Sequence, residues 1–281
     1  MTLASPQSAR LSGRKLPRSP TLTERDRRIL LLLGEYGCVS AERIKAHFWN
    51  ENPRSRAHYR RLGVLKRLLL IENVKGDGAV TIGYRLTKKG KELFSGMFDH
   101  RESSLMRRGY KTQFEHDQLL IDVRQVLQKS PLIRNFQTEV EVRKKMMSMQ
   151  TLKRHWEEMP TIPDALFSFE VPGQKMTVAV ELELTPKLRS RYTRIFRNHL
   201  LSKDWQLVIY IVKDTKFQDR LMKLLSEIKA TDIHVKIANT INGIYFCSLE
   251  DFLTKKLEAP MTNGKREISL ERIAQNFLAK R

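Results

Sequence analysis

The chain has 281 residues, 41% of them hydrophobic, which is enough for one large core or two ordinary ones. Its 52 Lys and Arg outnumber 31 Asp and Glu, and the resulting net charge of +21 favours a polyanionic partner. Residues 1–100 hold 20 basic and 9 acidic side chains, and residues 101–281 hold 32 and 22, so no detachable tail explains the excess. We expect two domains, both basic.

The cysteine content and the hydropathy exclude several classes of protein. Cys38 and Cys247 lie far apart and have no metal-ligand spacing, which argues against a disulfide scaffold and a zinc finger. The apolar runs, such as 29–33, are far too short to span a bilayer, and the polar N-terminus lacks the apolar core of a secretory signal. We therefore expect a cytoplasmic protein without a membrane partner. Residues 1–20, rich in Ser, Pro and Arg, predict a disordered basic arm.

Residues 21–98 predict helices followed by a hairpin. Thr23 precedes a first turn with acidic residues and an apolar stripe, and Ser40 is placed to cap a second helix. The third helix carries leucines on one side and cations elsewhere. The expected elements are helices beginning near 24 and over 41–48 and 54–70, strands over 71–74 and 80–86, and a closing helix over 87–94.

Three helices followed by a basic hairpin resemble a winged helix-turn-helix. In such a module the third helix enters the major groove and the hairpin lies along the backbone or the minor groove. A solvated helix face and a protein-docking module are the alternatives. The candidate DNA contacts are Arg54, Arg56, His58, Arg60 and Arg61 on the third helix, with Lys75 in the wing.

Residues 110–257 predict a domain with both helices and strands. A helix is expected over 112–129, strands over 136–142, from 164 and over 176–184, a helix over 186–200 and a strand over 205–212, with a polar loop over 144–160. The remainder predicts a helix over 216–229, short strands over 233–237 and 244–247, a helix over 249–257 and a tail over 258–281.

Three carboxylates fall on adjacent predicted strands. Asp164 opens an apolar run, and Glu181 and Glu183 lie two residues apart in another, so both glutamates point to one face of their strand. Burying such charge without compensation is costly, and a cation, a proton or a metal ion is expected nearby.

The element order and these acids resemble the PD-(D/E)xK nuclease fold of many restriction endonucleases. Pro163-Asp164 matches the motif that opens the second strand, Glu181-x-Glu183 the motif of the third strand, and Glu115 the acid of the first helix. The resemblance covers about residues 112–213. It implies a three-layer domain, α/β in class (α+β over the whole chain), and Mg²⁺ or Mn²⁺ held by Asp164, Glu181 and Glu183.

The third strand departs from this family pattern. Where these nucleases usually hold lysine, the chain has Glu183. Either Lys187 returns an ammonium group to the site and Glu183 is a third ligand, or the site is degenerate and the fold only binds DNA.

The helix expected over 186–200 supports a role with DNA. It carries five cations and no acid between its first basic residue and its last, which suits phosphate contacts better than simple solvation. Lys187, Arg191 and Arg194 form one stripe, which Arg189 and Arg197 extend.

A winged helix followed by this core, with His116-Asp117 in the first helix, resembles the replication-relaxation proteins of mobile elements, which include MobC-type relaxases. The resemblance implies nicking of double-stranded DNA at an origin of transfer or replication, with other relaxosome proteins as partners. Homodimerisation is left open. The alternatives are a non-catalytic accessory factor, a transcription regulator, and an RNA-binding or docking protein.

Overall fold

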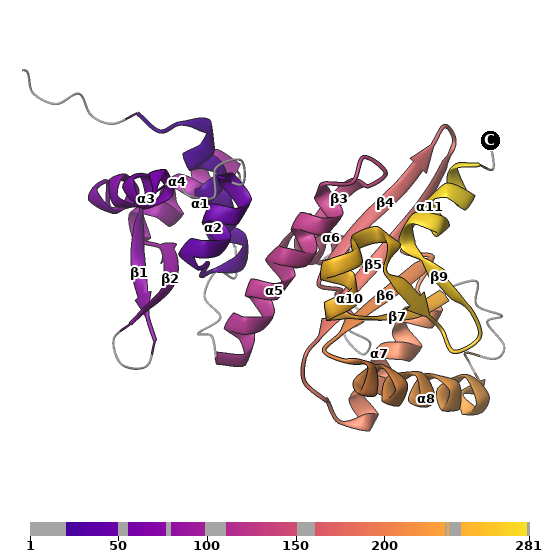
Figure 1. Ribbon diagram of the computed structural model, residues 1–281. Coiled ribbons are helices and arrows are strands. Elements are labelled where there is room, and N and C mark those ends of the chain that lie inside the picture. The colour runs from indigo at the N-terminus through magenta and orange to yellow at the C-terminus, as the bar shows by residue number, and fades with distance from the viewer. Residues whose placement is uncertain are drawn as a thin grey trace, which may run out of the picture.

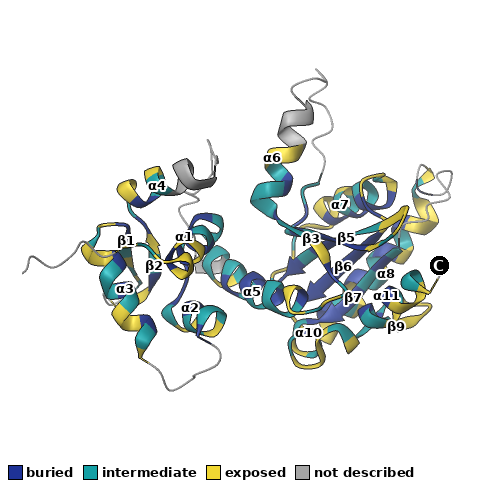
Figure 2. Ribbon diagram, turned by 90° about the horizontal axis from the view of Figure 1, so that it is seen from above, coloured by how far each residue is buried: buried dark blue, intermediate teal, exposed yellow. Residues whose placement is uncertain are grey.

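The computed structural model describes residues 21–49, 56–76, 80–98, 111–150, 161–233, 235 and 243–279. An N-terminal helical module and a C-terminal sheet domain lie on either side of helix α5 (Lys111–Gln128), as Figures 1 and 2 show. None of the helices in these ranges combines the length and the hydropathy of a transmembrane span.

The N-terminal module contains the predicted helices and hairpin. Helix α1 begins with a capping box, because Thr23 and Asp26 each accept a hydrogen bond from the other's backbone N–H. A close approach fixes the last helix: a Cβ at Gly90 would lie 2.0 Å from the Leu70 carbonyl oxygen. That the module is a DNA-binding winged helix stays a prediction. The elements are α1 (Glu24–Tyr36), α2 (Ala41–Phe48), α3 (Ala57–Arg67), β1 (Ile71–Lys75), β2 (Thr81–Leu86) and α4 (Lys88–Phe98).

The C-terminal domain is built on a sheet of order β3-β4-β5-β6-β7-β8-β9. Strands β5, β6 and β7 are parallel, because a helix crosses over between each pair, and the flanking strands pair antiparallel. The strands are β3 (Arg134–Thr138), β4 (Ala165–Val171), β5 (Gln174–Glu183), β6 (Leu207–Val212), β7 (Gly243–Ser248), β8 (Pro260–Thr262) and β9 (Glu267–Ser269).

Helices cover both faces of this sheet, so the domain has three layers and belongs to the α/β class, as predicted (Figure 2). One face packs against α5, α10 (Leu249–Lys255), a 3₁₀ turn (Lys256–Glu258) and α11 (Leu270–Leu278). The other packs against the crossover helices α7 (Arg189–Leu201) and α8 (Thr215–Thr231). Each parallel strand therefore has buried side chains on both sides, and β6 is buried throughout.

The strand predicted over 136–142 is wrong beyond Thr138. Helix α6 (Glu139–Gln150) begins there, because the Glu141 carboxylate accepts hydrogen bonds from both the N–H and the hydroxyl of Thr138. The loop predicted over 144–160 is helical as far as Gln150, and residues 151–160 lie outside the described part of the chain.

The C-terminal prediction also needs correction. Residues 258–281 were expected to be a tail, but they supply β8, β9 and α11, and Met261, Leu270 and Ala274 are buried in the core of the sheet domain. Ile233, expected to begin a strand, is helical, and most of 233–237 lies outside the described residues. The strand expected over 244–247 is confirmed as β7.

Candidate active site

The three predicted carboxylates meet beside the C-terminal end of β5. Asp164 immediately precedes β4, and its Oδ2 accepts a hydrogen bond of 2.8 Å from the Leu182 N–H. Val180 and Leu182 point into the core beneath α5 and α11, so Glu181 and Glu183 point to the opposite face, toward α7. The two glutamates therefore share a face, as their spacing predicts.

Each carboxylate is paired with one basic side chain that comes from another element or from the loop before α7. These partners are largely buried with the acids; the His199 side chain, for example, is 0% exposed. The burial of three acids is thus compensated inside the protein. The pairs are His116–Asp164 (Nε2 to Oδ2, 3.4 Å), His199–Glu181 (Nε2 to Oε1, 2.9 Å) and Lys187–Glu183.

His116 on α5 bridges two acids. Burial lowers its pKa, but hydrogen bonds and charge from Asp117 and Asp164 outweigh this effect and raise the pKa to about 10. The ring is therefore protonated at neutral pH. Its Nδ1 lies 3.3 Å from Asp117 Oδ1, and its Nε2 also donates to the Leu182 carbonyl oxygen at 3.1 Å.

The three acids differ in basicity. Burial raises the pKa of Asp164, but the hydrogen bond and charge of His116, followed by the Leu182 N–H, bring it below its ordinary value. Burial raises the pKa of Glu181. The hydrogen bond to His199 offsets this rise only in part, and the charge of Asp164 raises the pKa further. Burial likewise raises the pKa of Glu183 against the opposing charge of Lys187. Of the three acids, Asp164 loses its proton most readily, and the two glutamates accept a proton more readily.

Lys187 lies in the loop between β5 and α7, and its Nζ contacts Glu183 Oε2. Its charge also lowers the pKa values of Asp164 and Glu181. The ammonium group of Lys187 therefore lies beside Glu183, the strand position at which the family pattern has lysine. The Lys187 side chain is 27% exposed, so it borders solvent.

Asp164, Glu181 and Glu183 have the right kind of ligand atoms for a divalent ion, but their side chains are not arranged around a common point. In the described ranges, no group of three or more His, Cys, Asp or Glu lies close enough to hold a metal ion. The three-carboxylate metal site is therefore not preassembled, because each acid is turned to its own basic partner. Their oxygens are the hard ligands that Mg²⁺ and Mn²⁺ prefer. The buried Tyr210 hydroxyl nearby has no hydrogen-bond partner among the described residues, which indicates that a further polar group belongs here.

The first helix of this domain presents to Asp164 a different residue from the one predicted. Glu115, predicted as the helix acid, is exposed on α5, whereas the next residue, His116, faces Asp164. His199 and Tyr210 were not selected from the sequence at all. The signal available in the sequence was the presence of His199 on the helix that directly follows the strand with Glu181 and Glu183.

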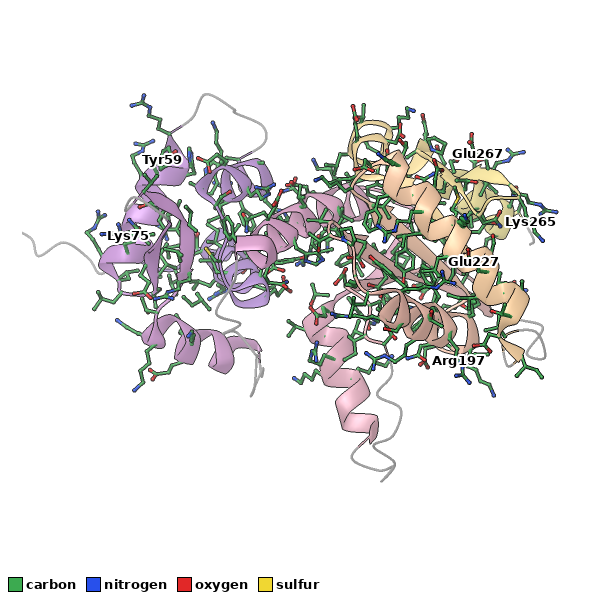
Figure 3. The ribbon with its side chains drawn as sticks, turned by 90° about the horizontal axis from the view of Figure 1, so that it is seen from below. Tyr59, Lys75, Arg197, Glu227, Lys265 and Glu267 are labelled. Atoms are coloured by element: carbon green, nitrogen blue, oxygen red, sulfur yellow. The ribbon has the colours of Figure 1, made fainter. Side chains whose placement is uncertain are left out.

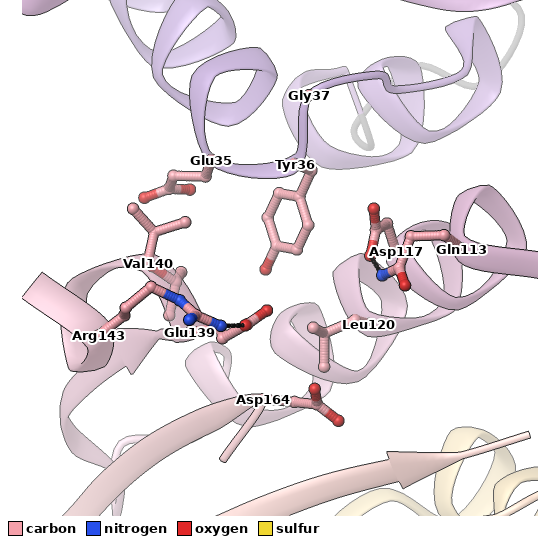
Figure 4. A pocket seen from close by; sticks show the side chains of 11 residues that line it. Glu35, Tyr36, Gly37, Gln113, Asp117, Leu120, Glu139, Val140, Arg143 and Asp164 are labelled. Carbon is pink, nitrogen blue, oxygen red and sulfur yellow. Dashed lines mark hydrogen bonds and ion pairs between the residues drawn. The ribbon is translucent and has the colours of Figure 1, made fainter. Parts of the chain in front are cut away.

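A pocket adjoins Asp164 where the N-terminal module, α5 and α6 meet. Its interior is about 70 Å³, room for a few water molecules. Figure 4 shows the Tyr36 hydroxyl and the Asp164 carboxylate pointing into it. Water can therefore reach Asp164 from the junction between module and sheet domain. The polar residues of its lining are Glu35, Tyr36, Gln113, Asp117, Thr138, Glu139, Arg143 and Asp164.

The predicted DNA contacts of the N-terminal module separate into exposed and buried side chains. His58 is only 2% exposed and packs against Tyr59, and Arg61 is ion-paired with the fully buried Asp26. Neither is placed to contact DNA, because both are needed for packing or for charge compensation. Arg54 lies outside the described residues. Arg56, Arg60 and Lys75 are exposed.

The exposed part of this surface includes an aromatic residue that sequence reasoning did not select. Figure 3 shows Tyr59 and Lys75 on the outer side of the module, turned away from the sheet domain. The Tyr59 residue is 50% exposed on α3. A half-exposed aromatic ring beside cations is suited to contact a base or a sugar.

The basic stripe on α7 is only partly available. Arg189 is ion-paired with Glu227 of α8 at 2.7 Å, and Arg197 lies 3.6 Å from Asp232. Arg191 and Arg194 are exposed, and no ion pair joins either to another described residue. Arg191 and Arg194 are therefore the arginines of this stripe that remain available to a phosphate.

Comparison with known proteins identifies no family. No protein-family description matches the chain, and no curated protein matches it. A solved structure of the restriction endonuclease FokI aligns with 13% identity and a TM-score of 0.23. The alignment covers 81% of this chain but 43% of that one, so the chain spans less than half of that protein's length. Such a TM-score is too low to transfer a fold or an activity.

Proposed function

We propose that the protein binds DNA and cleaves a phosphodiester bond at the cluster formed by Asp164, Glu181, Glu183 and Lys187, with a divalent metal ion. The observation that carries the proposal is the position of Lys187. Its ammonium group contacts Glu183 and acts electrostatically on Asp164 and Glu181. Two acids and a lysine beside the ends of β4 and β5 are the groups that nuclease chemistry of the PD-(D/E)xK type requires.

The residues have distinct roles in this proposal. Asp164 and Glu181 would be the main ligands of Mg²⁺ or Mn²⁺, and Glu183 a third. When bound, the ion supplies Lewis-acid stabilisation of the phosphate oxygens and lowers the pKa of a water molecule. Lys187 would stabilise the charge that develops on the phosphate as water adds to phosphorus and the bond to the leaving oxygen breaks. A second water molecule in contact with solvent would carry away the proton that this water releases.

The surface charge supports DNA as the substrate class. The chain carries a net charge of +21, and exposed cations lie on both the module and the sheet domain. The proposed DNA face of the module comprises Arg56, Arg60, Lys75 and Tyr59, and that of the sheet domain Arg191 and Arg194. We further propose, from the sequence resemblance alone, that the substrate is an origin of transfer or replication and that one strand is nicked.

Nicking of supercoiled plasmid tests this function directly. The plasmid carries candidate origin DNA from beside the gene, and the assay contains Mg²⁺ or Mn²⁺. Wild-type protein should convert it to the open circle, and Asp164→Ala or Glu181→Ala should lower the rate at least about 100-fold, since each removes a proposed ligand. Glu170→Ala, a surface acid on β4, is the matched control and should keep full activity. Equal rates for all four proteins would reject the proposal.

A second candidate is a DNA-binding protein without catalysis, either a relaxosome accessory factor or a transcription regulator. The side-chain pairing favours it, because each of the three carboxylates already has a basic partner within the protein. Specific binding of origin DNA, together with no Mn²⁺ binding by calorimetry and no nicking, would decide for this function. Preference for structured RNA over duplex DNA at the same salt concentration would instead indicate an RNA partner.

A further inference from the structure

Tyr210 lies at the centre of β6, directly beside the carboxylate cluster. Its Cα pairs with that of Glu181 in the parallel β5–β6 ladder, and both side chains point toward α7. The ring is 1% exposed and packs against Phe196 and Phe246 at centroid distances of 5.2 and 5.4 Å. This aromatic packing fixes the position of the ring and therefore that of its hydroxyl.

The hydroxyl is buried and lacks a hydrogen-bond partner in the described part of the chain. Leaving such a group unsatisfied costs about 1 to 3 kcal/mol. Phenylalanine would fill the same space without that cost, so packing alone explains the ring and leaves the hydroxyl unexplained.

The surroundings indicate what the hydroxyl could bind. Burial raises the pKa of Tyr210 well above its ordinary value, and the negative charges of Glu181 and Glu183 raise it further. Tyr210 therefore stays a neutral donor in the field of two carboxylates. His199 connects the same groups, because it pairs with Glu181 and its ring contacts the Tyr210 ring edge to face at 5.9 Å.

We propose that the Tyr210 hydroxyl is a positioning group of the metal site: when the ion binds, the hydroxyl donates a hydrogen bond to Glu181, directly or through one water molecule, and holds this carboxylate in its metal-binding orientation. The Glu181 Oε1 atom already accepts from His199, so the hydroxyl is the donor available for the rest of the carboxylate. A hydrogen bond to a charged acceptor is worth more than one between neutral groups, which justifies a buried hydroxyl here. The inference rests on the proposed metal-dependent function.

The test is Mn²⁺ binding to Tyr210→Phe by calorimetry, with the full chain. Removing an outer partner of a metal ligand typically lowers metal affinity 10- to 100-fold, and we expect a loss of about that size. The Tm without metal should stay equal or rise, because the variant removes an unsatisfied polar atom and keeps the ring. A hydroxyl with a purely structural role would give the reverse, a lower Tm and unchanged Mn²⁺ affinity.

Two controls make the outcome specific. Tyr245→Phe removes a hydroxyl on β7, on the other face of the sheet, and should leave Mn²⁺ affinity unchanged. In a double-mutant cycle, Tyr210→Phe should have little further effect once Glu181→Gln is present, because Tyr210 acts through Glu181. Wild-type binding with unchanged affinity in Tyr210→Phe, or an equal loss in Tyr245→Phe, overturns this inference alone. Absence of Mn²⁺ binding by the wild type overturns the proposed metal site itself and the inference with it.

Discussion

Arg60 and Arg61 are consecutive cations on α3 with different surroundings. Arg60 is exposed, whereas the guanidinium of Arg61 pairs with Asp26, which is 0% exposed and belongs to the capping box of α1. Burial raises the pKa of Asp26, but hydrogen bonds from Arg61 and Thr23 bring it below its ordinary value. Arg61 therefore holds α3 to α1, and only Arg60 is available to a phosphate.

Alanine substitutions should separate these two roles. Arg61→Ala leaves a buried carboxylate without its partner and is expected to lower the free energy of unfolding by about 3 kcal/mol. Arg60→Ala should change it by less than about 0.5 kcal/mol and should weaken DNA binding. Urea unfolding and fluorescence anisotropy with duplex DNA measure the two effects. Equal stability of the two variants would contradict the assignment.

At the scale of elements, the arginines of α7, which form one basic stripe in the sequence, divide into two that are ion-paired and two that are exposed. Arg189 and Arg197 point toward acids of α8 and of the segment that follows it, while Arg191 and Arg194 point to solvent. The exposed ion pair at Arg189 contributes little stability, since its guanidinium side chain is 74% exposed. Glu227 would nevertheless compete with a DNA phosphate for the guanidinium of Arg189.

The salt dependence of DNA binding should distinguish these pairs. Each phosphate contact contributes about 0.9 to the slope of log K against log salt concentration. Arg191→Ala/Arg194→Ala is expected to reduce that slope by about 2, and Arg189→Ala/Arg197→Ala by less, because Glu227 and Asp232 already hold those cations. The slope is read from anisotropy titrations at several salt concentrations. Equal reductions would show that the ion pairs open freely on binding.

The start of α6 shows that an alternating pattern can mislead. Val140 and Val142 alternate with acids as in a half-buried strand, but Thr138 and Glu141 have the spacing of a capping box. The cap satisfies the backbone at that point, and the chain turns into a helix. The signal was present in the sequence and was outweighed by the hydrophobic period.

At the scale of the whole molecule, α5 connects the proposed DNA-binding module to the proposed site. Ile121 is buried in the core of the module, while Val123 and Leu127 are buried in the core of the sheet domain. The Gln118 amide donates to the Cys38 carbonyl at 2.8 Å and accepts from the Ser40 N–H at 2.9 Å. Helix α5 thus carries His116 and also binds the N-terminal module. DNA bound to the module would therefore have a defined position relative to the sheet domain.

The junction contains a group that should make stability depend on pH. His47 of α2 accepts a hydrogen bond from the Gln125 amide of α5. Burial, followed by the charges of Arg124, Arg28 and Lys129, lowers its pKa from 6.5 to about 4. Neutral His47 therefore contributes stability that is fully present above pH 6.5 and is lost as the pH falls toward 4, because the unfolded chain takes up the proton first.

Thermal unfolding from pH 8 to pH 4 tests this expectation. The Tm of the wild type should fall more steeply below pH 6.5 than that of His47→Gln, which keeps a side-chain acceptor but cannot titrate. The difference between the two proteins should level off near pH 4. A difference that stays constant over the whole range would show that His47 has an ordinary pKa.

The sequence by itself determined the net charge, most helices and strands up to residue 212, and the shared face of Glu181 and Glu183, because each follows from composition or from a local period of 2 or 3.6 residues. Only the tertiary structure decided which base compensates each acid. His116, His199 and Tyr210 come to the cluster from two helices and a neighbouring strand, and their approach depends on how those elements pack. It likewise decided that Arg61 serves a buried acid and that residues 258–279 complete the core, since contacts between distant segments leave no periodic mark in the chain.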